Sequence, residues 1–190
     1  MPRAVPRTWQ TFEYFDSREV LLKLRAIEES LADYKIEGPV ISLRTRHLRP
    51  YNERRQAALF CYGISRLRRH PISYAPVEAE DFDCVARWTE GDTTHYTPIQ
   101  LKELPPNELN PKVALEAELA KLAKYASSPE LCVAFYLNRN LRLDLGQLRI
   151  PKLNIAELWL YGATTPDKST WRLWGNLLAS PVSVEYGYPA

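Results

Sequence analysis

The chain has 190 residues, and 25 Lys and Arg against 23 Asp and Glu give it a formal net charge of +2 at pH 7. The length suits one domain with a sizeable core, and the small net charge excludes a protein that binds nucleic acid through bulk charge alone. No apolar run approaches the ~18 residues of a membrane span and the N-terminus lacks a signal-type apolar segment, so we expect a cytoplasmic protein that does not contact membranes.

The first part of the chain predicts an irregular arm followed by two helices. Residues 1–16 carry prolines and aromatic side chains that we expect to pack onto the body of the protein. Apolar residues then recur at helical spacing over 17–34, with Asp16 or Ser17 as the cap. After Gly38 and Pro39 break the chain, a second helix is predicted over about 52–68, capped by Asn52.

The middle of the chain predicts three strands, a helix and a buried strand. The three strands are 72–77, 82–88 and 95–103, and the last two form a hairpin around the polar turn 89–94. Asn110 and Pro111 favour the start of a helix over about 111–126. The apolar run 131–137 is typical of a strand that is buried on both faces.

The pattern weakens beyond residue 138. Segments 140–145 and 155–160 are candidate strands, 169–178 is amphipathic, and 182–186 fits a final edge strand. Without an internal repeat or a linker, we expect one domain over 1–190. Three cysteines (Cys61, Cys84 and Cys132) lie far apart in apolar segments, which favours buried free thiols over disulfides or a zinc site.

The predicted hairpin carries the polar residues of greatest chemical interest. Side chains alternate along a strand, so Gln100 and Lys102 share one face while Leu101 points to the other. Asp81 and Asp83 share a face on the neighbouring arm. Carboxylate and amide oxygens beside an ammonium suit Mg²⁺ and a phosphate. The alternative is that the acids are solvated and that Lys102 only protects a strand edge.

Arginines concentrate in the segment before the strands. Eight arginines lie between residues 44 and 70, and Glu53 is the only acid there. The planar guanidinium matches the geometry of phosphate, so this segment fits a surface that holds a polyanion. The alternative is a solvated helix face whose counter-charges lie elsewhere in the fold.

The order of elements, with an acid on the second strand and Gln-x-Lys on the third, resembles the PD-(D/E)XK nuclease superfamily. The resemblance implies an α/β (α+β) protein with a restriction-endonuclease-like αβββαβ core, in which helices flank a mixed central sheet. The core would cover about 50–137, with an N-terminal helical extension over 1–49 and a C-terminal elaboration over 138–190.

Carried over by position, the resemblance implies a site for Mg²⁺ or Mn²⁺. Asp83 would be the metal-binding acid, with Asp81 as a competitor, and Gln100 would take the second metal-binding position. Lys102 would assist the attacking water, and Glu53 would be the acid that the preceding helix supplies. Two departures stand out: no Pro precedes the strand-two acid, and Gln100 replaces a carboxylate, which weakens the metal site.

The resemblance therefore implies a nuclease that hydrolyses phosphodiester bonds in DNA, or in RNA, in phage defence, restriction or repair. Many nucleases of this type act as homodimers. The arginines expected to grip nucleic acid are Arg54, Arg55, Arg66, Arg68 and Arg69. Two alternatives remain: an inactive nuclease-fold module that binds nucleic acid or a protein partner, and an unrelated α+β protein with a purely structural hairpin.

Overall fold

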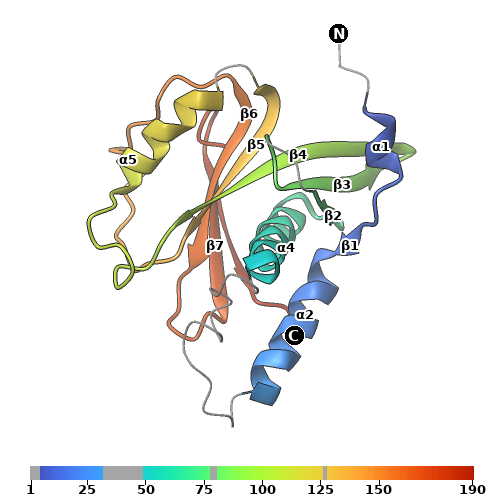
Figure 1. Cartoon of the computed structure of the whole chain (residues 1–190), viewed down its shortest axis with the longest axis horizontal. Helices are drawn as coiled ribbons and strands as arrows, with labels where there is room; N and C mark the ends of the chain where they lie inside the picture. The colour runs from blue at the N-terminus through green and yellow to red at the C-terminus, as the bar shows by residue number, and fades with distance from the viewer. Residues whose placement is uncertain (1–4, 32–48, 78–80, 126–127) are drawn as a thin grey trace.

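A curled mixed sheet forms the centre of the structure, a computed structural model that describes residues 5–31, 49–77, 81–125 and 128–190. Within these ranges eight strands lie in the sheet in the order in which they follow along the chain (Figure 1). The strands are β1 (Phe15–Asp16), β2 (Ser73–Pro76), β3 (Cys84–Glu90), β4 (Thr93–Leu104), β5 (Ser128–Leu137), β6 (Ile155–Ala163), β7 (Thr170–Gly175) and β8 (Val182–Gly187). The fold is therefore α+β.

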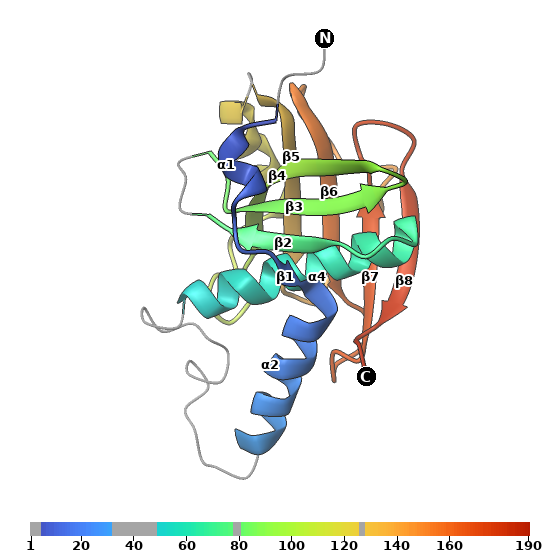
Figure 2. The same ribbon diagram turned by 90° about the vertical axis from the view of Figure 1, so that its right-hand side faces the viewer.

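Helices cover both faces of this sheet. They are α1 (Arg7–Gln10), α2 (Ser17–Leu31), α4 (Arg49–Arg68), α5 (Leu115–Ala120) and the 3₁₀ helix η1 (Lys121–Tyr125). The long helix α4 lies in the curl of the sheet and contacts β2, β4, β7 and β8, while α2 packs against α4 (Figure 2). The α5–η1 segment covers the other face. No helix in the described ranges is both long and apolar enough to cross a bilayer.

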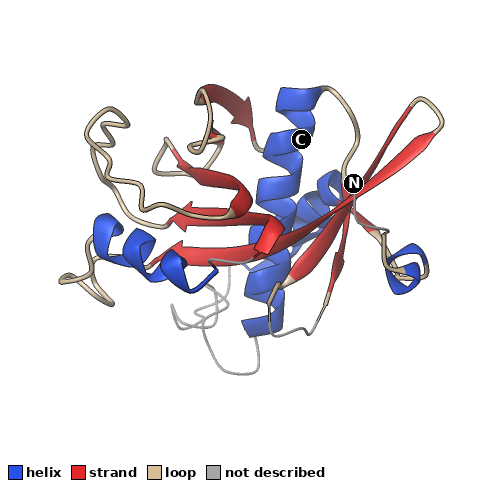
Figure 3. Ribbon diagram, turned by 90° about the horizontal axis from the view of Figure 1, so that it is seen from above, coloured by secondary structure: helices blue, strands red, loops and turns tan. Residues whose placement is uncertain are grey.

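Strand directions divide the sheet into three parts. Strands β1 to β4 are antiparallel neighbours, β4, β5 and β6 are parallel, and β6 to β8 are again antiparallel. The β3–β4 hairpin closes through Gly91 and Asp92, and Gly91 has a φ of +57°, a backbone region that glycine enters without steric cost. Seen from above, the tip of this hairpin projects beyond the helices (Figure 3).

Two apolar cores lie on opposite sides of the sheet. The first joins α4 to the curled face and includes Phe60, Tyr74 and Trp171, which are each at most 2% exposed. The second joins α5 and η1 to the other face through Leu119 and Leu158. A side chain on β4 therefore faces one core or the other according to its position in the alternation.

Arg139 fixes the connection that leads from β4 to α5. Its guanidinium donates hydrogen bonds to the carbonyl oxygens of Pro105 (2.7 Å), Val113 (2.9 Å) and Asn110 (3.0 Å). Three carbonyl groups of an irregular segment are satisfied by one side chain. Because α5 and η1 follow directly, this clasp also helps to position the covering segment over β4.

Most predicted elements are confirmed. Both N-terminal helices form, and Asp16 caps α2 by accepting a hydrogen bond from the Glu19 N–H (2.9 Å). The hairpin, the strand at 131–137 and the final strand are present, and β8 lies at the edge of the sheet. Trp9, Tyr14 and Phe15 pack on aromatic rings of the body, as expected. The short extended segment predicted near Val40 lies outside the described residues.

Several boundaries were predicted wrongly. Helix α4 begins at Arg49, so Asn52 lies inside the helix and is not its cap. Helix α5 begins at Leu115, four residues beyond Pro111. Segment 140–145 is not a strand: its alternating leucines pack against the second core without pairing to a neighbour. The amphipathic stretch 169–178 contains strand β7, and the sheet has four strands beyond the predicted core.

The three cysteines are buried free thiols, as predicted. Burial raises the pKa of the Cys61 thiol to about 12 and raises the pKa values of Cys84 and Cys132 as well. The neutral thiol is thus favoured in the folded protein, and an unfolded thiol titrates near 9.0. Thiol burial therefore stabilises the fold fully below pH 9.0, and this stabilisation is lost as the pH rises through about 12.

We expect Ellman's reagent at pH 8 to modify none of the three thiols in the native protein and all three in guanidinium chloride. Above pH 9 the free energy of unfolding should fall by up to about 1.4 kcal/mol per pH unit for each thiol. Urea titrations at pH 8, 9 and 10 measure this slope. Rapid modification of any thiol under native conditions would contradict the buried assignment.

Candidate functional site

Asp83 lies directly before β3, at the point where three strands meet. Its N–H donates to the Ile99 carbonyl on β4 (2.9 Å), and its own carbonyl accepts from the Val77 N–H that follows β2 (3.0 Å). Because the next residue, Cys84, pairs with Ile99, the hairpin register sets Asp83 beside Gln100. The backbone therefore holds Asp83 in a fixed position between its neighbours.

The Asp83 carboxylate is held by donors from β4. Its Oδ2 accepts a hydrogen bond from the Leu101 N–H (2.6 Å) and another from the Gln100 side-chain amide. The Gln100 Oε1 in turn accepts from the Tyr125 hydroxyl (2.8 Å), and Gln100 is only 6% exposed. The competing acid, Asp81, is exposed, so the geometry favours Asp83 over Asp81 as the residue of the site.

Lys102 follows on the same face of β4. Its Nζ lies 5.8 Å from the centroid of the Tyr125 ring, and the Nζ of Lys124 lies 4.8 Å from the same centroid. The η1 tyrosine thus contacts two ammonium groups while it binds Gln100. A ring face within about 6 Å of a cation attracts it, which limits where the Lys102 amine can move.

Glu53 approaches Asp83 from the other side of the sheet. Both residues line a pocket of about 230 Å³ between the start of α4 and the β2–β3 edge, together with Arg54, Tyr74 and Leu101. Leu101 belongs to the α4-side core, whereas Gln100 binds Tyr125 of the other core. The predicted site residues therefore lie on two sides of the sheet. Asp83 lines the α4-side pocket together with Glu53, and its carboxylate accepts a hydrogen bond from Gln100, whose side chain lies on the other side.

The pocket carries two of the residues predicted to bind Mg²⁺, Asp83 and Glu53. This cation prefers oxygen ligands and often uses only one or two protein carboxylates, with water and substrate phosphate completing the shell. Gln100 does not line this pocket, and its amide oxygen accepts the Tyr125 hydroxyl on the other face of the sheet. Among the described residues, no group of three or more His, Cys, Asp and Glu side chains is arranged to hold a metal.

The five predicted nucleic-acid-binding arginines point to different parts of the surface. Arg55 forms an ion pair with Glu28, and Arg68 pairs with Glu157 (3.0 Å). Arg54 lines the Asp83 pocket and lies 5.6 Å from the centroid of Phe15. Arg66 and Arg69 line a second, larger pocket at the opposite end of α4.

Sequence reasoning missed two features of this region. Tyr125 fits the apolar face of the helix predicted over about 111–126, but its hydroxyl donates to Gln100. A chain of polar side chains also runs from α4 to the residue that follows β5: Gln56 donates to Glu103 (3.3 Å), and Asn138 donates to the same carboxylate (2.7 Å). The polar residue at position 56, in an otherwise apolar helix face, was the available signal.

The structure thus brings Asp83 and Gln100 together, with Lys102 on the same face of β4, while Glu53 shares only the pocket on the α4 side with Asp83. Comparisons with protein-family models, with curated proteins and with solved structures found no match for this chain.

Proposed function

We propose that this protein is a metal-dependent nuclease that hydrolyses phosphodiester bonds in DNA or RNA. The observation that carries the proposal is the contact between Asp83 and Gln100, with Lys102 on the same face and Glu53 across the pocket. Gln100 donates to the Asp83 carboxylate from 17 positions further along the chain, and Glu53 lines the same pocket as Asp83. These are the residue types that the resemblance to PD-(D/E)XK nucleases requires.

The strand arrangement supports the same proposal. Helix α4 is followed by three antiparallel strands, β2, β3 and β4, and the α5–η1 crossover then leads to β5, which lies parallel to β4. This order of elements is the αβββαβ order that the resemblance implies. Asp83 immediately precedes the second of these strands, and Gln100 and Lys102 lie on the third, at the positions that the family pattern uses.

In this proposal each residue of the site has its own role. A divalent cation bound at the pocket would polarise the scissile phosphate and lower the pKa of a bound water. Asp83 and Glu53 would hold that cation, with Gln100 as an additional oxygen donor. Lys102 would orient the attacking water or stabilise the charge that develops on the phosphate.

One observation favours a second function, a nuclease-fold module that binds nucleic acid without cutting it. The Gln100 oxygen, which would have to bind metal, accepts the Tyr125 hydroxyl, and its amide nitrogen faces Asp83. A closed hydrogen-bond network of this kind stabilises a fold whether or not a metal ever binds. The two functions differ in cleavage and in metal binding, and both are measurable.

The test compares the wild type with Asp83→Asn and with Asp81→Asn, a control that removes the same charge two residues away. We expect calorimetry to show Mn²⁺ binding in the wild type and in Asp81→Asn, and its loss in Asp83→Asn. Labelled single-stranded DNA, duplex DNA and RNA should be screened for cleavage with Mg²⁺ and Mn²⁺.

Full cleavage by Asp83→Asn would exclude the proposed site. Salt-dependent binding to DNA by all three proteins, without cleavage or metal binding, would support the non-catalytic module. Circular dichroism and thermal unfolding of each variant show whether the fold is retained, because Asp83 also accepts the Leu101 N–H.

A further inference from the structure

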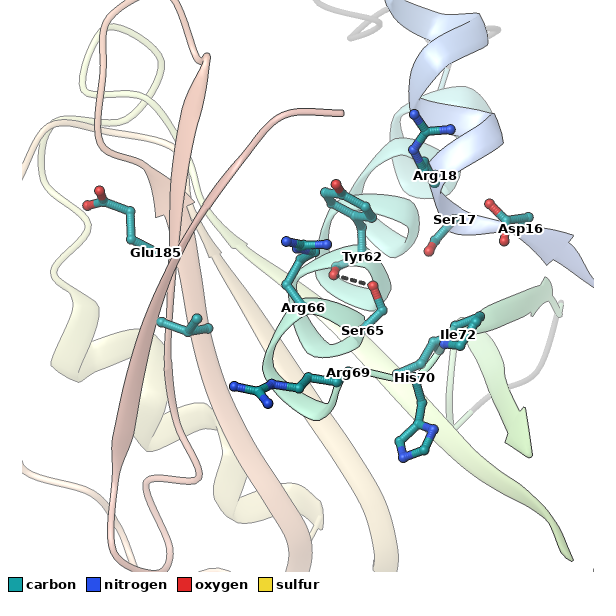
Figure 4. Close-up of a pocket in the computed structure, with 12 residues that line it drawn as sticks. Asp16, Ser17, Arg18, Tyr62, Ser65, Arg66, Arg69, His70, Ile72 and Glu185 are labelled. Carbon is teal, nitrogen blue, oxygen red and sulfur yellow. Dashed lines mark hydrogen bonds between the residues drawn. The ribbon is translucent and has the colours of Figure 1, made fainter. Parts of the chain in front are cut away.

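A pocket of about 720 Å³ lies between the first turn of α2, the end of α4 and strand β8 (Figure 4). Its volume falls within the range of small-molecule sites, about 300–1,000 Å³. It is separate from the Asp83 site, because Arg66 follows Glu53 by 13 residues of the same helix. At 1.5 Å per residue this places the two about 20 Å apart.

The lining of this pocket is basic. Its basic side chains are Arg18, Arg66, Arg69 and His70. Arg18 donates to the carbonyl of Ala190 (2.6 Å), and within the described part of the chain Arg66 and Arg69 have neither a hydrogen-bond partner nor an ion pair. By contrast, Arg55 and Arg68 of the same helix are paired with acids.

The two acids that border the pocket do not neutralise these arginines. Asp16 is engaged at the start of α2, where its carboxylate accepts the Glu19 N–H (2.9 Å). Glu185 forms an ion pair with Arg172 (2.5 Å), and Figure 4 shows its side chain directed away from Arg66. Among the described residues no acid therefore neutralises Arg66 or Arg69, and their charge favours an anion that enters from solvent.

The backbone also directs Arg69 to this place. It follows the last residue of α4 and has a φ of +59°, a conformation in which glycine is the usual residue at a helix end. Ser17, which is 2% exposed, and Tyr62 add hydroxyl groups to the lining. Guanidinium groups and hydroxyl donors around one cavity are the groups that recognise phosphate oxygens.

We infer that this pocket binds the phosphate group of a small phosphorylated molecule of nucleotide size. Arg66 and Arg69 supply the guanidinium groups, and Arg18 and His70 also line the pocket. The site is independent of the proposed nuclease chemistry, because none of its residues lines the Asp83 pocket.

The test is calorimetric titration of the full chain with inorganic phosphate, pyrophosphate, AMP, ATP and an oligonucleotide that lacks terminal phosphates. We expect ATP to bind, with an affinity that falls as salt is added. Arg66→Gln combined with Arg69→Gln should weaken this binding at least about tenfold. The control, Arg142→Gln combined with Arg149→Gln, removes the same charge outside the pocket and should leave the affinity unchanged.

A third variant, Arg69→Gly, relieves the backbone conformation while removing the guanidinium, so it should weaken binding although the fold is retained. The inference is overturned if the nucleotides and phosphates do not bind at millimolar concentration, or if both double variants bind equally well. It is also overturned if only the oligonucleotide binds, because the pocket would then serve a nucleic-acid strand. None of these outcomes depends on cleavage. The phosphate-binding inference can therefore fail while the nuclease proposal holds, and the reverse.

Discussion

Replacing Lys102 with methionine is expected to lower the rate of phosphodiester hydrolysis by about 100- to 1,000-fold, the cost of removing one well-placed donor to a developing negative charge. Methionine keeps most of the volume and the apolar stem of lysine, so packing against Tyr125 changes little. Mn²⁺ binding should be retained, because the proposed metal ligands are Asp83 and Glu53. Single-turnover cleavage with saturating metal separates this loss from any change in substrate affinity.

Lys124→Met provides the matched control. Both lysines lie near the same Tyr125 ring, at 5.8 Å and 4.8 Å from its centroid, but Lys124 is exposed on η1 while Lys102 is half-buried on β4. If position matters, Lys124→Met should lose less than about threefold, the size of a screened surface charge effect. Equal losses of activity in the two variants would show that overall positive charge, and not the position of Lys102, is responsible. Full activity of Lys102→Met would show that Lys102 has no role in the mechanism.

The contact between Asp83 and Gln100 was accessible from the sequence because hairpin pairing depends only on where the turn lies. The midpoint of the gap between the predicted arms, 82–88 and 95–103, falls between Gly91 and Asp92, which form the observed two-residue loop. Counting outward equally along both arms places Asp83 opposite Gln100.

Other features needed three-dimensional information. The hydrogen bond from Tyr125 to Gln100 joins residues that no local pattern relates, since it depends on how the crossover returns over the sheet. The alternating leucines of 140–145 indicated a buried face, but alternation does not say whether a partner strand exists. Strand β7 alternates between buried and half-buried residues, yet its two tryptophans also fit an amphipathic helix. Side-chain periodicity thus predicts which residues are buried better than it predicts their backbone partners.

Replacing Gly63 with alanine should lower the free energy of unfolding by about 1–2 kcal/mol. In most helix positions the same change raises it by about 1 kcal/mol, because alanine has the higher helix propensity. A Cβ atom at position 63 would lie 2.9 Å from the ring carbons and hydroxyl oxygen of Tyr186. That ring is 4% exposed, and its hydroxyl donates to the Leu59 carbonyl (3.2 Å), so it cannot move without shifting β8. Thermal unfolding should show a Tm lower by about 2–4 °C per kcal/mol.

A double-mutant cycle with Tyr186→Leu tests the cause. Leucine is shorter than tyrosine, so in that background Gly63→Ala should become neutral or stabilising, because only the helix propensity remains. Destabilisation of the same size in both backgrounds would show that Tyr186 is not the obstacle. The close approach of α4 to β8 also borders the basic pocket, since Tyr62 and Val184 line it. A shift of β8 in Gly63→Ala should therefore weaken ATP binding as well, which links the packing of this glycine to the proposed phosphate site.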